Sequence, residues 1–206
     1  MKYYENGDLH SYLDETQGVL CWRDIVDMLW GISGGIEEIH RNDLIHGNLH
    51  GGNVLIENES DSIDTCITDI GLHNSIDKKT SNQIYGVLPY VAPDILKGNP
   101  PTKASDIYTT EICFGLRPKI INGTPEVYVQ LMTQCWHSDP LKRPTASKLN
   151  IILEDWINAI CDNPIPTKIS DQFDIAEEKK FLDFKFHNQK IHSQAFYTST
   201  LLHLLN

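Results

Sequence analysis

The stretch HGNLHGGNVLI, residues 46–56, decides the fold, together with CITDIG, residues 66–71. Each contains a short apolar run of the length of a buried strand, and a polar, turn-rich segment, residues 57–64, separates the two runs. This order predicts two neighbouring strands that bring Asn53 and Asp69 to adjacent strand ends. An amide oxygen and a carboxylate placed there would form the kind of oxygen site that Mg²⁺ prefers, usually beside substrate phosphates.

Both stretches resemble motifs of the protein kinase family. Residues 46–53 resemble the catalytic loop, and DIG at residues 69–71 resembles the metal-binding D-F-G motif, with isoleucine in place of phenylalanine. The resemblance implies that Asn53 and Asp69 are the metal-binding and cofactor-binding residues. The cofactors that it implies are Mg²⁺ and ATP.

The loop departs from the family pattern at two positions. Asn48 stands where the family has its catalytic aspartate, and Gly47 replaces the arginine that would clamp a phosphorylated activation segment. A carboxylate accepts the proton of a substrate hydroxyl, whereas a neutral amide has no useful basicity, and losing a positioned base costs about 10²–10⁴ in rate. We therefore expect a site that keeps its metal-binding residues but has lost its base.

Motifs further along the chain extend the resemblance in the order of the family. APD at residues 92–94 resembles the A-P-E motif, SDIY at residues 105–108 resembles the start of the central helix, and CWHSDPLKRPT at residues 135–145 resembles C-W-x-x-D-P-x-x-R-P-T. The resemblance pairs Arg143 with Asp94 in the interior. The residues to which it assigns structural roles are His46, Gly71, Asp94, Asp106 and Arg143.

Apolar periodicity predicts the main helices. Apolar residues recur at spacings of three and four between Trp22 and Ile39, which indicates a long buried helix. Three glycines interrupt this helix at about 1 kcal/mol each relative to alanine, and close packing against another helix would explain them. An apolar helical face follows at residues 127–136, and Thr145 caps a final helix. The sequence also permits a helix over residues 174–186.

These features predict a mainly α fold, a protein-kinase-like C-terminal lobe with the N-terminal lobe absent and the central helix region shortened. Residues 1–21 are interpreted as a turn and short helix resembling the kinase hinge, with no preceding glycine-rich loop or strand lysine to hold ATP. Residues 109–113 lead almost directly into a segment that the family places much later. We expect a domain over residues 1–161 and a tail over residues 162–206, partly helical or disordered. The tail is interpreted as solvated, with its end, residues 201–205, as an alternative partner-binding strip.

The amino-acid composition indicates which classes of partner and which cellular location to expect. The chain has 17 basic and 28 acidic residues among 206, a net charge of −11, which would repel nucleic acid and anionic membranes. We therefore expect neither as a partner, and no apolar run approaches the length that crosses a bilayer. The five cysteines have no paired spacing and nothing resembles a secretory signal, so we expect reduced thiols and a cytoplasmic location.

Three histidines raise a zinc site as an alternative. His46 and His50 have the i, i+4 spacing of helical ligands, and His40 is nearby, but the glycines after His50 indicate a loop. Further ligands at a defined spacing are missing. We therefore expect His46 to be a structural residue that is hydrogen-bonded inside the loop.

We interpret the chain as a protein-kinase-like protein, a catalytically impaired pseudokinase fragment that acts through protein partners the sequence does not name. The spelling LHGGN at residues 49–53 resembles the tyrosine-kinase-like group. The alternative is a functional ATP-dependent protein kinase that phosphorylates Ser, Thr or Tyr of protein substrates in signalling, because phosphoryl transfer rests mainly on positioning and charge. A third interpretation is an incomplete gene product with no stable fold.

Overall fold

The computed structural model describes residues 3–16, 20–59, 62–70, 84–86, 90–110, 120, 122–161, 165–184 and 200–202. The described helices are α1 (Leu9–Thr16), α2 (Trp22–Arg41), α3 (Pro93–Leu96), α4 (Lys103–Thr110), α5 (Glu126–Cys135), α6 (Ala146–Cys161) and α7 (Lys168–Phe184), with 3₁₀ turns η1 (Gly51–Asn53) and η4 (Pro140–Lys142). The described strands are β1 (Val54–Asn58), β2 (Ile63–Ile67), β3 (Ile84–Gly86) and β4 (Thr200–Leu202). The predicted mainly helical fold class is confirmed. Among the described helices, none has an apolar stretch that could span a bilayer.

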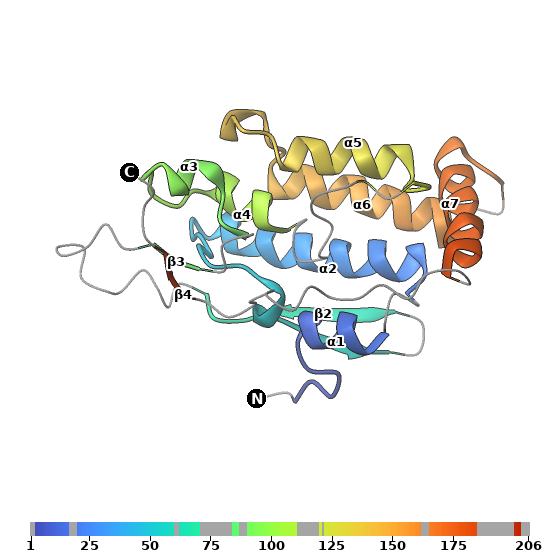
Figure 1. The fold of residues 1–206 in the computed structure, drawn as a ribbon, viewed down its shortest axis with the longest axis horizontal. Helices are drawn as coiled ribbons and strands as arrows, with labels where there is room; N and C mark the ends of the chain where they lie inside the picture. Colours follow the sequence, from blue (N-terminus) through green and yellow to red (C-terminus); the bar gives the residue numbers. More distant parts are fainter. Residues whose placement is uncertain are drawn as a thin grey trace.

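Helix α2 lies at the centre of the fold (Figure 1). It follows the predicted apolar stripe, because Leu29, Ile32 and Ile36 are fully buried. One face of α2 packs against α6 and another against β2, so the helix separates the α5 and α6 layer from the β1–β2 hairpin (Figure 1). The C-terminal end of α2 leads directly into the loop that carries the predicted site.

The predicted pair of strands is present as an antiparallel hairpin. Its register runs from Val54 opposite Ile67 to Asn58 opposite Ile63. Each strand extends into the segment that is predicted as a turn, residues 57–64, since β1 ends at Asn58 and β2 begins at Ile63. Polar residues can join the strands because an antiparallel sheet needs only one buried face.

The glycines of α2 are explained by close packing, but two of them face a strand and not a helix. A Cβ atom at Gly31 would lie 2.3 Å from Thr65 Oγ1, and one at Gly35 would lie 2.9 Å from Ile67 Cδ1. Gly34 faces α6 instead, where the nearest atom to an added Cβ would be Asn150 Oδ1 at 3.9 Å. Side chains at Gly31 and Gly35 would therefore push α2 away from β2.

This difference predicts opposite effects for two neighbouring substitutions. Gly31→Ala should lower the free energy of unfolding by about 1–3 kcal/mol, because overpacking against Thr65 outweighs the better helix propensity of alanine. Gly34→Ala has room for its methyl group and should raise the free energy of unfolding by up to about 1 kcal/mol. Urea unfolding followed by circular dichroism measures both. Equal shifts in the same direction would contradict the packing of α2 on β2.

The helices after the predicted site follow the sequence closely. Helix α5 buries Tyr128, Leu131 and Met132 from the predicted apolar face. Helix α6 begins after Thr145, whose Oγ1 accepts a hydrogen bond from the Lys148 N–H at 3.2 Å, as expected of an N-cap. Helix α4 is the start of the predicted central helix, and the segment on which its shortening was predicted, residues 111–119, lies outside the described residues.

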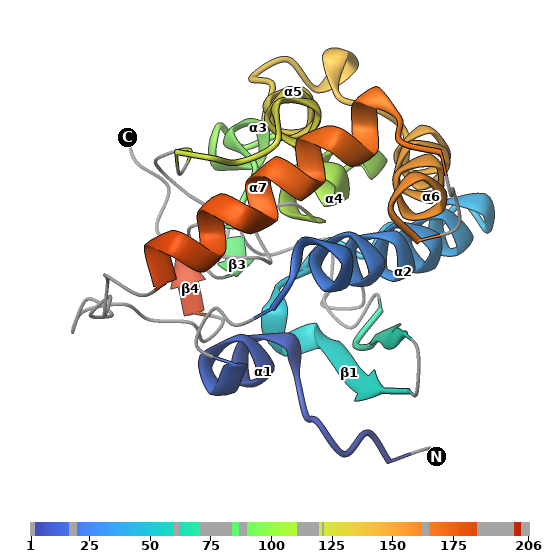
Figure 2. The ribbon, with the colours of Figure 1, turned by 90° about the vertical axis from the view of Figure 1, so that its right-hand side faces the viewer.

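Helix α7 packs onto the core, which differs from the expected solvated tail. It begins six residues before the predicted start at residue 174, and it crosses the ends of α2, α5 and α6 (Figure 2). Phe173 and Ala176 are each only 2% exposed. The Phe173 ring lies 6.0 Å from the Trp22 ring and 5.6 Å from the Trp156 ring, and this aromatic burial stabilises the docked helix. The expected domain boundary at Cys161 stays a prediction.

Polar side chains of α7 also bind the start of α2. The Glu177 carboxylate accepts a hydrogen bond from the backbone N–H of Trp22 at 2.7 Å. The Lys180 ammonium donates a hydrogen bond to the Leu20 carbonyl oxygen. Burial lowers the pKa of Lys180, and the nearby Glu177 carboxylate opposes that shift. An acidic side chain at a helix N-terminus satisfies an otherwise unpaired backbone N–H group. Helix α7 therefore holds α2 at the end opposite to the predicted site.

Candidate functional site

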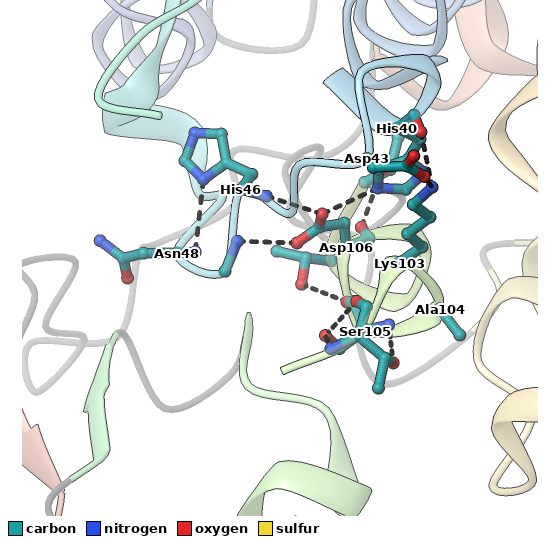
Figure 3. A network of polar contacts seen from close by, with 12 residues as sticks. His40, Asp43, His46, Asn48, Lys103, Ala104, Ser105 and Asp106 are labelled. Atoms are coloured by element: carbon teal, nitrogen blue, oxygen red, sulfur yellow. Dashed lines mark hydrogen bonds and ion pairs between the residues drawn. The ribbon is translucent and has the colours of Figure 1, made fainter. Parts of the chain in front are cut away.

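Asp106 of α4 holds the loop that follows α2 (Figure 3). Its Oδ2 accepts a hydrogen bond from the His46 backbone N–H and contacts His40 Nε2, both at 2.9 Å, and its Oδ1 accepts from the Gly47 N–H at 2.9 Å. The residue is only 2% exposed. A buried carboxylate needs such donors to offset its lost hydration. Asp106 therefore joins α4, the end of α2 and the loop into one unit.

His46 connects this loop to the end of β2. The residue is 1% exposed, and its Nδ1 accepts a hydrogen bond from the Asn48 N–H at 3.3 Å. Since Nδ1 is then the unprotonated nitrogen, Nε2 carries the hydrogen and donates to the Thr68 carbonyl oxygen at 2.9 Å. In the part of the chain that the structure describes, no three His, Cys, Asp or Glu side chains are grouped to hold a metal ion. The ring thus occupies a hydrogen-bonding position inside the loop.

Gly47 has a backbone reason to be glycine. Its φ of 76° lies in the left-handed region, which glycine adopts without steric cost. Another residue type there, arginine included, would cost about 1–2 kcal/mol in backbone strain. In this loop the glycine therefore serves the conformation that presents its N–H to Asp106.

Asn53 and Asp69 lie at the same end of the β1–β2 hairpin. The Thr68 N–H donates to the Asn53 carbonyl oxygen at 2.9 Å, which continues the hairpin by one pair. The Asn53 side-chain nitrogen donates to the Asn48 carbonyl oxygen at 2.9 Å, which leaves the amide oxygen as an acceptor. Asp69 follows Thr68, is exposed, and has a left-handed φ of 62°. The structure thus brings the two predicted metal-binding positions to neighbouring places in the fold.

These two residues fit Mg²⁺ by the chemistry of their donors. Both the Asn53 amide oxygen and the Asp69 carboxylate are hard oxygen ligands. Mg²⁺ commonly takes one or two protein oxygens and completes its shell with water and substrate phosphates. When bound beside a nucleotide, the ion would neutralise charge on the phosphates. Gly71, the other residue predicted at this motif, lies outside the described residues.

Asn48 lies at the predicted position of the base, with its peptide groups held on both sides. Its N–H donates to His46 and its carbonyl oxygen accepts from Asn53. Its side chain points away from Asp106 (Figure 3). The loop therefore presents a neutral amide at the position where a base would need a carboxylate.

A second buried cluster joins Asp94 of α3 to Arg143. The Arg143 Nη2 donates to Asp94 Oδ1 at 2.5 Å, Nη1 donates to the Ala104 carbonyl at 3.0 Å, and Nε donates to the His137 carbonyl at 2.9 Å. The guanidinium carbon lies 4.9 Å from the centre of the Tyr108 ring. The Arg143 side chain is 0% exposed and that of Asp94 is 10% exposed. The structure thus pairs the two residues that the resemblance paired.

Sequence reasoning missed the roles of His40 and Lys103. His40 was weighed only as a zinc ligand, yet its ring contacts Asp106. Lys103 Nζ donates to the His40 carbonyl at 2.6 Å and to Asp43 Oδ1 at 2.8 Å (Figure 3). Their partners are 60 or more residues away in the sequence, so no local spacing could have signalled these contacts.

Comparison with known proteins finds matches to protein kinases. A family model described as protein tyrosine and serine/threonine kinase matches residues 1–115, more than half of the chain. Mitogen-activated protein kinase kinase kinase 13-A of Xenopus laevis is 26% identical over 232 residues, covering 100% of this chain and 23% of that protein. "Probable serine/threonine-protein kinase roco8" of Dictyostelium discoideum is 28% identical over 203 residues, covering 82% of this chain and 11% of that protein.

The chain belongs to the protein tyrosine and serine/threonine kinase family. The matched residues include the Asp106 cluster and the hairpin that carries Asn53 and Asp69. The chain spans between 11% and 23% of the length of the two relatives described above.

Proposed function

We propose that the chain is a protein-kinase-like protein whose catalytic step is impaired and that it acts through protein partners. Asn48 carries this proposal. The hydrogen bonds that His46 and Asn53 make to its peptide groups hold the loop in shape, while its side chain is an amide. A positioned base contributes about 10²–10⁴ to rate, and an amide cannot supply it.

In this proposal, residues 1–161 are the C-terminal lobe of a kinase domain of the tyrosine-kinase-like group. The order of elements supports the lobe, since α2 leads into the loop, the hairpin follows, and the Asp94–Arg143 pair and α6 come later. The sequence LHGGN at residues 49–53 supports the assignment to the tyrosine-kinase-like group. Residues 162–206 are the following tail, of which α7 packs on the lobe.

The proposed partners are proteins, and the proposed location is the cytoplasm. A net charge of −11 disfavours nucleic acid and anionic membrane surfaces. The four cysteines in the described part of the chain are free, which suits a reducing compartment.

A phosphotransfer assay tests the proposal. The full chain is incubated with Mg²⁺, radiolabelled ATP and casein, beside the Asp69→Ala variant. We expect the wild-type chain to incorporate no more phosphate than Asp69→Ala, because the chain lacks the base even where its metal-binding residues are in place.

Asp43→Ala is the matched control, since Asp43 is also an exposed aspartate with a left-handed φ, of 55°, and lies outside the hairpin. Turnover that persists in Asp43→Ala and disappears in Asp69→Ala would overturn the proposal of impaired catalysis.

The alternative function is an active ATP-dependent protein kinase that phosphorylates Ser, Thr or Tyr of protein substrates in signalling. The observation that favours it is the retained pair of oxygen donors, Asn53 and Asp69, at neighbouring strand ends. Because phosphoryl transfer depends mainly on positioning and charge, such a pair could support slow turnover. Titration of the chain with fluorescent ATP and Mg²⁺ tests this alternative, since an active kinase must bind nucleotide and an absence of binding would exclude it.

A further inference from the structure

A strand near the C-terminal end of the chain pairs with a strand that follows the candidate site. β4 lies antiparallel to β3, with Ile84 opposite Leu202, Tyr85 opposite Leu201 and Gly86 opposite Thr200. Figures 1 and 2 show the two strands side by side, apart from the β1–β2 hairpin. Segments more than 110 residues apart in the sequence therefore share one small sheet.

The position of β3 in the sequence relates it to the candidate site. Along the chain, β3 comes after Asp69, at the end of the hairpin, and before Asp94, which pairs with the buried Arg143. Under the proposed function, residues 69–94 are the activation segment, which runs from the metal-binding motif to the A-P-D motif. Backbone hydrogen bonding to β3 is therefore hydrogen bonding to that segment.

The end of the chain suits a strand that is added to another strand. Residues 191–206 contain no Asp, Glu, Lys or Arg, although the chain as a whole has a net charge of −11. They include Phe196, Tyr197 and four leucines. An uncharged apolar segment with strand propensity is prone to pair with exposed backbone edges. Pairing with β3 gives this segment a partner within its own chain.

We propose that the edge of β3 is a docking site for an extended peptide and that the chain's own C-terminal segment occupies it as an internal ligand. Addition of a strand to an exposed edge is a general mode of peptide recognition, in which main-chain hydrogen bonds provide the affinity. The proposal rests on the proposed function only in naming residues 69–94 as the activation segment.

The internal strand is suited to be displaced. A two-stranded pair of three residues on each side is too small to be stable by itself. Covalent connection favours this pair, because it makes the pairing of the two strands an intramolecular event. A peptide or partner strand that binds more tightly would release residues 200–202 and pair with β3 in their place.

A peptide-binding experiment on the full chain tests this. A fluorescein-labelled peptide with the sequence of residues 196–206 is titrated with the wild-type chain and with Leu201→Pro/Leu202→Pro, and fluorescence anisotropy is recorded. In an antiparallel pair, the backbone N–H groups that bond to the neighbouring strand occur at every second residue. Proline has no N–H group, so one of two successive prolines must remove a hydrogen bond between β4 and β3. The variant should bind the peptide at least about tenfold more tightly than the wild type, since no internal strand competes. Its amides at residues 84–86 should exchange with deuterium faster.

Gln194→Pro is the matched control, because it places a proline in the same tail outside β4, and it should behave like the wild type. Equal peptide affinity of the wild type and the double variant, or unchanged amide exchange at residues 84–86, would overturn the proposal. The measurements contain no nucleotide and do not use Asn53 or Asp69. Failure of the proposed function in the phosphotransfer assay is therefore distinguishable from failure here.

Discussion

Replacing Arg143 with methionine should lower the free energy of unfolding by about 3–5 kcal/mol, because it leaves a buried carboxylate without its partner. The Arg143 side chain is fully buried and donates to Asp94 and to two backbone carbonyls. Removing it takes one donor away from each of these three acceptors, and methionine of similar length fills the space without replacing any donor. Urea unfolding followed by tryptophan fluorescence measures the loss.

A double-mutant cycle isolates the pair. Asp94→Ala/Arg143→Met removes both charges and should be less destabilised than the sum of the two single variants, because no lone buried charge remains. Asp43→Ala is the matched control, since it breaks the exposed Lys103–Asp43 pair, in which the Asp43 side chain is 94% exposed. It should leave the unfolding midpoint nearly unchanged. Additive single losses would contradict coupling between Asp94 and Arg143.

Replacing Asp106 with alanine should lower the free energy of unfolding by about 3–5 kcal/mol, since each buried donor left without an acceptor costs about 1–3 kcal/mol. The His46 and Gly47 amides and the His40 ring all lose their acceptor. The loop that holds Asn48 and Asn53 should loosen as a result. Chemical unfolding measures the stability, and amide exchange at residues 46–53 measures the loosening.

The Asp106→Asn variant removes the negative charge of the side chain but keeps its shape, so it separates the effects of the two on stability. The asparagine keeps one acceptor oxygen and should lose about half as much stability as Asp106→Ala. Asp155→Ala, at an exposed position of α6, controls for the removal of an aspartate from a helix and should change stability by less than about 0.5 kcal/mol. Unchanged exchange at residues 46–53 in Asp106→Ala would contradict the role of Asp106 as the anchor of the loop.

Much of the fold could be predicted because its signals are local. The apolar stripe from Trp22 to Ile39 predicted α2, the short apolar runs predicted β1 and β2, and Thr145 predicted the start of α6. The candidate site could be predicted in part for the same reason, since its residues cluster in two short motifs. What could not be predicted were the contacts of His40 and Lys103 and the packing of Gly31 on a strand.

The amino-acid sequence by itself determined α2, α5, α6 and the two strands of the β1–β2 hairpin, the order of the kinase-like motifs, and the presence of an amide, Asn48, where the resemblance expects the base. These follow from residue type and spacing within one segment, which a chain carries before it folds. Only the tertiary structure decided that Asp106 binds the loop, that α7 caps the start of α2, and that β4 lies on β3. Each of these joins segments 60 to 155 residues apart, where the contact depends on how whole elements pack and not on any local pattern.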